Sequence, residues 1–520
     1  MARAEERVAL GAASILFVNI VQLVLNVGTF IIIANLLPTS EIGIISGIQI
    51  LVLGVSTLST LSLHQAVMKF IPEQLSRNEP AKALYTLRLS FFSVLAAATP
   101  LSALLFFAAD PISKIIFRGE ANPLWIQVAA VDSWVFALAL LFTGLLMGQH
   151  RIPRASLLQI VSFSVRYLLS AVLVILGFSV LGVVIAYLIG DLVLLVFAIA
   201  SATFRLANKP ERVPLRMLYG YSLPLLLAVM IGQLGWGGTA FGILQIDKVF
   251  ALLQLGPSQL GVYTVVVAAA SIAAFAPTAT AMALVPTLSS ISARGQRDQF
   301  LKVSRAYTRY VSLIAVPVSF MIASLAPALT QLFGTQYLPG ALPAAAISIA
   351  VGVTAIGAVY QGQLLAQRGT REVMIANGIG LAFFISLLFA LIPSLGLMGA
   401  AWSRAIMTII IVVLMAFFTR IQKNFVLDWR AYFASIAAST AMALILFSLV
   451  TGIGDYQRQI ASLPLLIPLG FTLYFFFLRA LRTFTNEDVK FLADLLPHRL
   501  QMLTRWIAKI GGIEKEETSD

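Results

Sequence analysis

Four ionisable side chains stand inside long apolar stretches of this sequence, where a charge is expensive to keep. They are Asp132, Arg166, Asp191 and Arg404. At the centre of a membrane helix a charged group costs about 2.5–3.5 kcal/mol on insertion scales, so such groups mark functional sites by default. An arginine guanidinium presents several donors in one plane and matches phosphate or carboxylate oxygens. We therefore expect Arg166 and Arg404 to bind an anionic group of a substrate.

The two aspartates allow more than one role, and the sequence leaves the choice open. Asp132 and Asp191 could bind a coupling ion, H⁺ or Na⁺, that drives a transport cycle. Alternatively, one of them pairs permanently with Arg166 and neutralises it. A pair that exchanges for substrate would combine both roles. No other cofactor is expected, because the sequence has no cysteine and no pair of His and Glu residues at metal-ligand spacing.

The first apolar stretch carries amides along one side. Residues 10–37 contain no charged side chain and, at about 1.5 Å per residue, can cross a bilayer core of about 30 Å. Asn19, Gln22 and Asn26 lie three and four residues apart, which places them on one helix face. Amides are costly in hydrocarbon, so this face should meet other helices or a water-filled cavity. The amides expected to contact substrate are Asn19, Gln22, Asn26, Gln49 and Gln233.

Composition indicates an all-α polytopic membrane protein. Of the 520 residues, 59% are hydrophobic and 11% are charged, against about 25% charged in soluble domains. Apolar runs of membrane-spanning length recur along the whole chain. We predict about 14 transmembrane helices, at residues 9–36, 42–62, 89–109, 124–147, 157–178, 181–203, 218–244, 261–286, 309–333, 341–366, 373–392, 396–418, 432–452 and 461–481.

The basic residues fall in short loops on alternate sides of these spans. With the N-terminus in the cytoplasm, most of the 35 Lys and Arg residues face inside, as the positive-inside rule requires. We therefore expect a multi-pass protein of the cell (plasma) membrane with both termini in the cytoplasm. This arrangement also accounts for the net charge of +13, so no nucleic acid partner is expected.

The first twelve predicted spans contain an internal repeat with a period of about 217 residues. The matching segments are 37–43 with 256–261, 70–72 with 284–286, 144–149 with 362–367, and 180–184 with 396–400. Because six helices is an even number, both repeats enter the membrane from the same side, and transporters of this kind bind substrate between the halves. We predict two parallel six-helix lobes at 1–217 and 218–431, two extra C-terminal helices at 432–482, and a cytoplasmic amphipathic tail at 483–520.

With these features in place, the chain resembles the polysaccharide (Wzx-type) flippases of the multidrug/oligosaccharidyl-lipid/polysaccharide (MOP) exporter superfamily. The resemblance covers essentially residues 8–482 and includes the arrangement of six, six and two spans. Its motifs are Gln65-Ala-Val-Met-Lys-Phe-Ile-Pro-Glu73, Asp247-Lys248, Leu255-Gly-Pro-Ser-Gln-Leu-Gly-Val-Tyr263, Pro286 and Leu332-Phe-Gly334. The related lipid II flippases carry arginines in the first helix, and the related drug exporters carry an acidic residue there; this chain has amides only.

The resemblance implies a fold like that of the drug exporters (MATE) and of MurJ, and a transport function. Such proteins move polyprenyl-linked oligosaccharides, joined through a pyrophosphate, from the cytoplasmic to the outer leaflet by alternating access. The implied partners are the polyprenyl-linked oligosaccharide and membrane lipid, and we expect a monomer that supports polysaccharide or glycan biosynthesis.

Two other classes of function deserve comparison with a flippase. A membrane enzyme would need a catalytic cluster, and the sequence contains no GxSxG motif, no phosphate-binding Walker loop and no group of histidines near carboxylates. We therefore expect no enzyme. A cation-coupled drug or small-molecule antiporter on the same scaffold is the alternative, and it would depend chiefly on Asp132 and Asp191.

Overall fold

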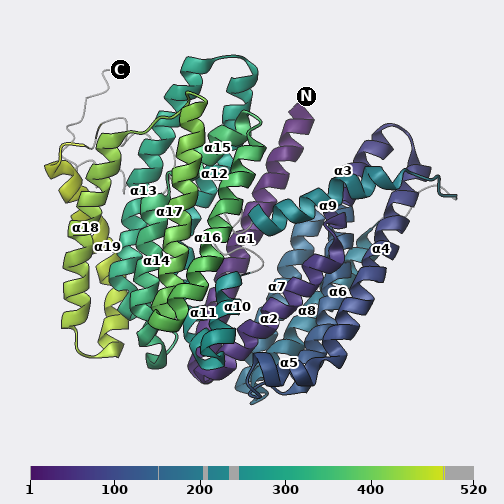
Figure 1. Cartoon of the computed structure of the whole chain (residues 1–520), viewed down its shortest axis with the longest axis horizontal. Coiled ribbons are helices and arrows are strands. Elements are labelled where there is room, and N and C mark those ends of the chain that lie inside the picture. Colours follow the sequence, from purple (N-terminus) through teal and green to yellow (C-terminus); the bar gives the residue numbers. More distant parts are fainter. Residues whose placement is uncertain (1, 150, 203–208, 233–244, 484, 486–520) are drawn as a thin grey trace. The chain divides into compact units, whose positions relative to one another are not determined.

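The computed structural model describes residues 2–149, 151–202, 209–232, 245–483 and 485. In this part of the chain the structure consists of nineteen α-helices and two 3₁₀ turns joined by short connections, without a strand. The helices that Figure 1 labels are mostly long and apolar. The prediction of an all-α polytopic membrane protein is therefore confirmed.

Twelve of the described helical segments are long and apolar enough to cross a membrane. They correspond to twelve of the predicted spans. The two other predicted spans fall on the first helix, in which Val21–Leu36 is a shorter apolar segment, and on residues 218–244, which the structure describes only up to Gly232. The count of about 14 is consistent with these helices.

The chain folds into two compact units, which we call unit 1 and unit 2. Unit 1 contains the described residues of Met1–Met230 and Ile243–Thr264, and unit 2 those of Ile231–Gly242 and Val265–Asp520. These units follow packing, whereas the predicted lobes follow the sequence repeat, so the lobe boundaries stay a prediction. Nearly all of the predicted tail at 483–520 lies outside the described residues.

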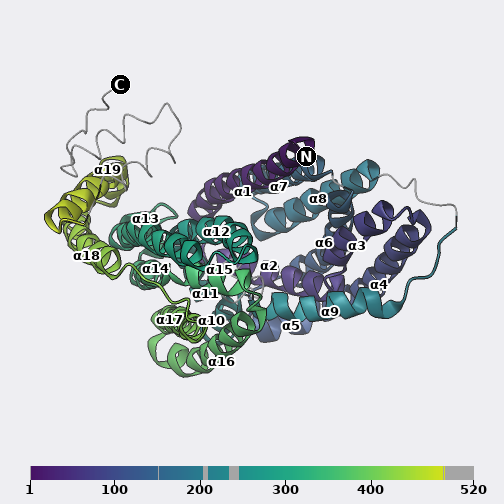
Figure 2. The same ribbon diagram turned by 90° about the horizontal axis from the view of Figure 1, so that it is seen from above.

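Unit 1 is a bundle centred on one deeply enclosed helix. Its helices are α1 (Ala2–Leu36), α2 (Thr39–Thr60), α3 (Leu63–Ser76), α4 (Pro80–Phe107), α5 (Ala109–Ile116), α6 (Pro123–Gly148), α7 (Ile152–Ile175), α8 (Ser179–Ser201), most of α9 (Leu215–Gly232), α10 (Ile246–Leu255) and the first half of α11 (Pro257–Ser271). Helix α6 packs against α2, α3, α4 and α8, and α7 packs between α1 and α8, as Figure 2 shows from above.

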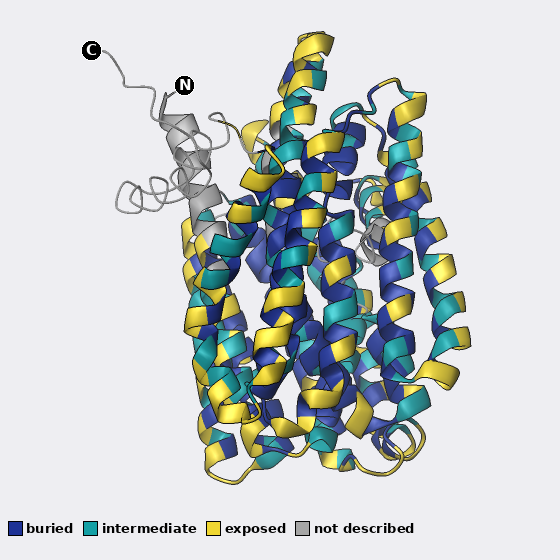
Figure 3. Cartoon of the chain, turned by 90° about the vertical axis from the view of Figure 1, so that its left-hand side faces the viewer, coloured by how far each residue is buried: buried dark blue, intermediate teal, exposed yellow. Residues whose placement is uncertain are grey.

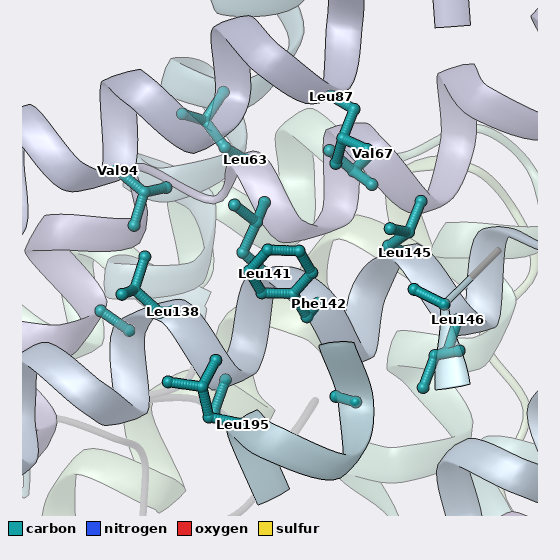
Figure 4. Packing of buried hydrophobic residues seen from close by; sticks show 14 of the residues in the cluster. Leu63, Val67, Leu87, Val94, Leu138, Leu141, Phe142, Leu145, Leu146 and Leu195 are labelled. Atoms are coloured by element: carbon teal, nitrogen blue, oxygen red, sulfur yellow. The ribbon is translucent and has the colours of Figure 1, made fainter. Parts of the chain in front are cut away.

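The core of unit 1 forms where α6 meets its neighbours. Figure 4 shows this cluster of buried aliphatic and aromatic side chains, which includes Leu63, Val67, Leu87, Val94, Leu138, Leu141, Phe142, Leu145, Leu146 and Leu195. Glycines let the backbones of α6 and α3 approach closely, as small residues do in membrane bundles. A Cβ atom built on Gly144 would lie 2.5 Å from the His64 carbonyl oxygen, and one on Gly148 would lie 3.1 Å from the Met68 Cα.

Unit 2 is built around its longest helix. It contains the rest of α11, the 3₁₀ turn η1 (Ile272–Ala274), α12 (Phe275–Ala293), α13 (Arg297–Gln331), the 3₁₀ turn η2 (Thr335–Gly340), α14 (Ala341–Thr354), α15 (Gly357–Ala366), α16 (Thr370–Leu395), α17 (Leu397–Ile421), α18 (Trp429–Gly452) and α19 (Tyr456–Ala480). Helices α14, α18 and α19 pack on α13. The Tyr474 hydroxyl donates to the Leu313 carbonyl at 3.0 Å, and the Ser435 hydroxyl donates to the Ser312 carbonyl at 2.7 Å.

The outward faces of the helices are apolar rather than charged. Phe107 is 82% exposed and Leu465 is 73% exposed, and Figure 3 shows exposed and buried residues alternating around the same helices. In water, apolar surface on this scale would be covered by a partner or would aggregate. These faces therefore fit contact with lipid, as expected of a multi-pass membrane protein.

The close crossing of α3 and α6 gives a prediction about stability. We expect Gly144→Leu to lower the free energy of unfolding by about 1–3 kcal/mol, because the new side chain meets the α3 backbone. Gly378→Leu on α16 is the matched control, since a Cβ atom there meets nothing within 4 Å. Chemical unfolding of the purified protein in detergent measures both, and equal loss in the two variants would contradict the crossing.

Candidate functional site

Arg166 forms an ion pair with a carboxylate on the next helix. Its Nη2 atom lies 3.2 Å from the Oδ2 atom of Asp191, and the two side chains are 14% and 1% exposed. Arg166 is on α7 and Asp191 on α8, and Gly190 allows the two helices to meet. A Cβ atom on Gly190 would lie 2.9 Å from the Arg166 Cβ. The glycine beside the aspartate thus brings the carboxylate within reach of the guanidinium.

Aromatic rings hold the same guanidinium from other directions. The Arg166 Cζ atom lies 4.1 Å from the centroid of the Tyr187 ring on α8 and 5.9 Å from that of the Phe136 ring on α6. A cation over an aromatic face is attracted by the ring quadrupole, most strongly where water is excluded. Arg166 is therefore fixed by a carboxylate and by aromatic faces, all within unit 1.

Asp132 adds a second carboxylate to this site. It lies on α6, is 1% exposed, and interacts electrostatically with Asp191 and Arg166. If both carboxyl groups were ionised beside one guanidinium, the three side chains would carry a net negative charge in the interior of the bundle. A proton on one of the two acids would make them neutral. We call Asp132, Arg166 and Asp191 the charge cluster.

Two of the predicted amides interact with tyrosines beside the charge cluster. The Gln49 Nε2 atom on α2 donates to the Tyr187 hydroxyl at 2.7 Å. On α1, the Gln22 side chain interacts with Tyr167, whose ring packs edge-on against Tyr187 with centroids 6.3 Å apart. The cluster is thereby connected to α1 and α2 as well as to α6, α7 and α8. Sugar hydroxyls form hydrogen bonds of the same kind with amide and phenol groups.

Arg404 lies in the other unit and has its own aromatic neighbour. It is 4% exposed on α17, and its Cζ atom lies 5.9 Å from the Phe384 ring centroid on α16. The structure places Arg166 in unit 1 and Arg404 in unit 2. Each arginine thus stacks on an aromatic ring from the adjacent helix of its own unit.

The two arginine–aromatic pairs occupy equivalent places in the repeat. A Cβ atom on Gly182 at the start of α8 would crowd Leu173 of α7, and one on Gly399 at the start of α17 would overlap the Leu391 carbonyl of α16. These contacts stand at the repeat spacing and align α7 with α16 and α8 with α17. In that alignment Arg166 and Phe384, and likewise Tyr187 and Arg404, fall at equivalent places to within one residue of the match of 180–184 with 396–400. The arginine is thus on the first helix of the pair in unit 1 and on the second in unit 2.

The remaining predicted residues are not brought into this network. Asn26 is exposed on α1. The Asn19 side chain and the whole of Gln233 lie outside the described residues. Among the described side chains, no group of three or more His, Asp or Glu residues could hold a metal ion. The role of every predicted site residue stays a prediction.

Sequence reasoning missed the tyrosines. Tyr167 follows Arg166 directly, and Tyr187 precedes Asp191 by one helical turn, so that it shares a face with that carboxylate. This spacing is the signal that could have identified Tyr187. An aromatic residue in an apolar helix is ordinarily a packing residue, which is why the pattern alone did not single it out.

The charge cluster gives a prediction that a double-mutant cycle can test. Arg166→Gln leaves two buried carboxyl groups without a cation, and breaking such a pair costs about 3–5 kcal/mol in the free energy of unfolding. Adding Asp191→Asn restores neutrality, so the double variant should regain much of that loss. Arg458→Gln, which disturbs an exposed pair with Asp455, should change little. Chemical unfolding in detergent measures the wild-type protein, Arg166→Gln, Asp191→Asn, the double variant and Arg458→Gln, and simple additivity of the two single effects would contradict the pairing.

Comparison with known proteins gives one family and one fold. The family model "Polysaccharide biosynthesis protein" matches residues 8–292. A structure of the lipid II flippase MurJ in an inward closed conformation is similar, with a TM-score of 0.66 and 15% identity over 94% of this chain and 100% of that one. An inward-facing multidrug resistance MATE family transporter of the MOP superfamily has a TM-score of 0.59 and 17% identity over 77% of this chain and 94% of that one.

No match was found among curated proteins. The family match covers more than half of the chain, and the two structural similarities, at low identity, show the fold. The resemblance to the Wzx-type polysaccharide flippases is therefore confirmed. This chain belongs to the polysaccharide biosynthesis protein family and has the fold of a MOP superfamily flippase or transporter.

Proposed function

We propose that this protein moves a lipid pyrophosphate-linked oligosaccharide from the cytoplasmic to the outer leaflet of the cell membrane by alternating access. The observation that carries the proposal is the charge cluster of unit 1 together with the amide and phenol groups beside it. A pyrophosphate needs a planar cationic donor, which Arg166 supplies, and the sugar needs neutral donors and acceptors, which Gln22 and Gln49 supply. The substrate crosses unchanged, so the protein acts as a transporter and not as an enzyme.

Exchange of partners at Arg166 is the proposed switch. A buried guanidinium that lost Asp191 without replacement would be left unpaired, which is strongly unfavourable. A phosphate oxygen that takes the place of the Asp191 carboxylate keeps the guanidinium paired throughout. The ion pair therefore holds the empty site neutral and gives way only to another anion, such as the pyrophosphate.

The same exchange links substrate binding to a proton. Once Asp191 is released from Arg166, it and Asp132 form two buried carboxyl groups beside each other, which in our proposal hold one proton. A second proton restores neutrality, because like charges at this separation disfavour double ionisation. We therefore propose H⁺ rather than Na⁺ as the coupling ion, taken up as the substrate arrives and released as the empty pair re-forms.

A cation-coupled antiporter is the second candidate, and one feature of unit 1 favours it. Two carboxyl groups stand beside a single arginine, so a small cation could replace the shared proton. Arg404 favours the anionic substrate instead, since it places a second buried guanidinium in the other unit. The two candidates differ in the role of Arg404, because a site that binds cations does not need a second buried cationic side chain.

The anion-binding role of the arginines predicts the behaviour of two variants. We expect Arg166→Ala and Arg404→Ala each to lower the rate of flipping by at least about tenfold, which corresponds to 1.4 kcal/mol at the barrier. Arg458→Ala, at an exposed arginine, should flip at the wild-type rate. The assay uses vesicles that contain undecaprenyl pyrophosphate-linked oligosaccharide and follows its appearance in the opposite leaflet. Full activity of both buried-arginine variants at normal expression would rule out the anion-handling role.

The coupling proposal predicts a change in the response to pH. Asp132→Asn replaces the carboxyl group that shares the proton with Asp191 by an amide that cannot release one. We expect an imposed pH gradient to accelerate the wild-type protein in vesicles and to leave the Asp132→Asn variant unaffected. Acceleration of the wild-type protein by a Na⁺ gradient alone, with no effect of pH, would overturn proton coupling.

A further inference from the structure

The start of α18 and the end of α19 lie together at one end of unit 2. Helices α18 and α19 pack against each other, and both pack on α13 (Figure 1). The Arg309 side chain on α13 joins the two ends, because its Nη1 atom donates to the Asp428 carboxylate at 3.0 Å and its Nη2 atom donates to the Thr483 carbonyl at 2.8 Å. Asp428 also caps α18 by accepting from the Ala431 N–H at 3.0 Å. These bonds hold the two helix ends in a defined arrangement.

Two further arginines are brought together at this end. The Arg430 Nη2 atom, in the first turn of α18, donates to the Arg482 carbonyl just after α19 at 2.8 Å. Both side chains are exposed, and neither forms an ion pair with a described residue. The carboxylate of Asp428 is already engaged by Arg309 and by the helix cap. Two guanidinium groups therefore remain here without an acidic partner in the part of the chain that the structure describes.

The outward face of α18 carries aromatic side chains beside this charge. Trp429 and Phe433 are exposed, and their rings stack with centroids 5.7 Å apart and an interplanar angle of 14°. At about 100° per residue, Phe433 lies between Trp429 on one side and Arg430 on the other. The same face continues with exposed Leu444 and Phe447. A cation and an indole thus stand at one end of an apolar strip long enough for an acyl chain.

This arrangement matches the head and tail of a phospholipid. A guanidinium forms charge-assisted, often bidentate, hydrogen bonds with phosphate oxygens. Tryptophan is enriched at the membrane interface, where its ring contacts acyl chains and its N–H reaches the polar headgroups. A zwitterionic headgroup brings its own cation beside the phosphate, whereas an anionic headgroup brings only negative charge. The charge of two arginines therefore favours an anionic phospholipid.

The leaflet that supplies this lipid follows from the placement of other basic residues. At the same end of unit 2, the Arg297 Nη2 atom donates to the Lys423 carbonyl at 3.1 Å, and both side chains are exposed. The positive-inside rule predicts that an end rich in arginine and lysine faces the cytoplasm. Anionic lipids give the cytoplasmic leaflet a negative surface potential, which attracts such residues. An anionic phospholipid is thus the expected neighbour of this end.

We propose that Arg430, Arg482 and Trp429 form a binding site for the headgroup of an anionic phospholipid, whose acyl chain lies along Phe433 and the outward face of α18. The lipid phosphate supplies the anion that the two arginines lack among the described residues. By neutralising both of them, it stabilises the contact between the start of α18 and the end of α19. The site lies entirely within unit 2 and does not depend on the proposed transport function.

The test identifies the lipid that lies next to Trp429. The protein is placed in vesicles of equal parts phosphatidylglycerol and phosphatidylcholine, and one lipid or the other carries bromine, a contact quencher of tryptophan fluorescence, on its acyl chains. The chain has six tryptophans, so the Trp429 signal is the difference between the wild-type protein and Trp429→Phe. We expect phosphatidylglycerol to be the neighbour at least about fivefold more often, the fold-change for one arginine near an anionic lipid. Equal quenching by the two brominated lipids would overturn the site.

Two double variants show whether the preference belongs to this site. In Arg430→Gln/Arg482→Gln we expect the two brominated lipids to quench Trp429 equally. Arg88→Gln/Arg154→Gln is the matched control, because it removes two exposed arginines from α4 and α7 of unit 1, and it should keep the wild-type preference. A preference that survives the loss of Arg430 and Arg482, or that disappears equally in the control, would contradict a specific site.

A competition experiment separates a lipid site from a site for any anion. Inorganic phosphate presents the same oxygens without an acyl chain, so at the concentration of the lipid it should leave the quenching preference unchanged. Loss of the preference in inorganic phosphate would show that the arginines bind a free anion, and the lipid site would fail. The wild-type comparison can overturn the proposal by itself, so the test does not depend on the folding of the double variant.

Discussion

The electrical neutrality of a buried site is the constraint on which the rest of unit 1 depends. Arg166, Asp191 and Asp132 lie in the interior of an apolar bundle, where an unpaired charge would cost several kcal/mol. The Arg166–Asp191 ion pair satisfies that constraint for two of the three groups, and we propose that a proton on Asp132 satisfies it for the third. In this proposal the site has two stable states: the closed ion pair, and a state in which an external anion and a further proton replace it. A small number of such states is what alternating access requires.

Glycines and amides place the helices of unit 1 around the charge cluster. Gly190 brings α8 against α7 at the ion pair, and Gly144 brings α6 against α3 so that the aliphatic core closes on the other side of α6. Gln49 connects the cluster to α2 through the Tyr187 hydroxyl, and Gln22 on α1 interacts with Tyr167. A rearrangement at Arg166 therefore has a direct physical connection, through Tyr187 and Gln49, to α2.

Much of the architecture could be predicted from hydropathy, because long apolar runs and the placement of basic residues depend on the bilayer rather than on detailed packing. The same logic singled out Asp132, Arg166, Asp191 and Arg404, since charge within an apolar span is rare. The partner of Arg166 could not be predicted, because it depends on which helix faces meet. From the sequence Arg166 could pair with either aspartate, and the structure pairs it with Asp191. Tyr187 was missed because an aromatic residue in an apolar helix is usually a packing residue. Only the structure shows that the Arg166 guanidinium lies over its ring. The sequence showed that segments 37–43 and 256–261 are repeats of each other. Only the structure shows that they are in contact.

We propose that Asp132 and Asp191 share a proton in the empty site, and infrared spectroscopy measures such a proton directly. A protonated carboxyl group has a C=O stretching band that an ionised carboxylate lacks. We expect such a band at neutral pH in the substrate-free wild-type protein, its loss in Asp132→Asn, and its retention in Asp455→Asn, where an exposed carboxylate is replaced. A wild-type spectrum without the band, or a band that survives Asp132→Asn unchanged, would contradict the neutral cluster and the exchange proposed for it.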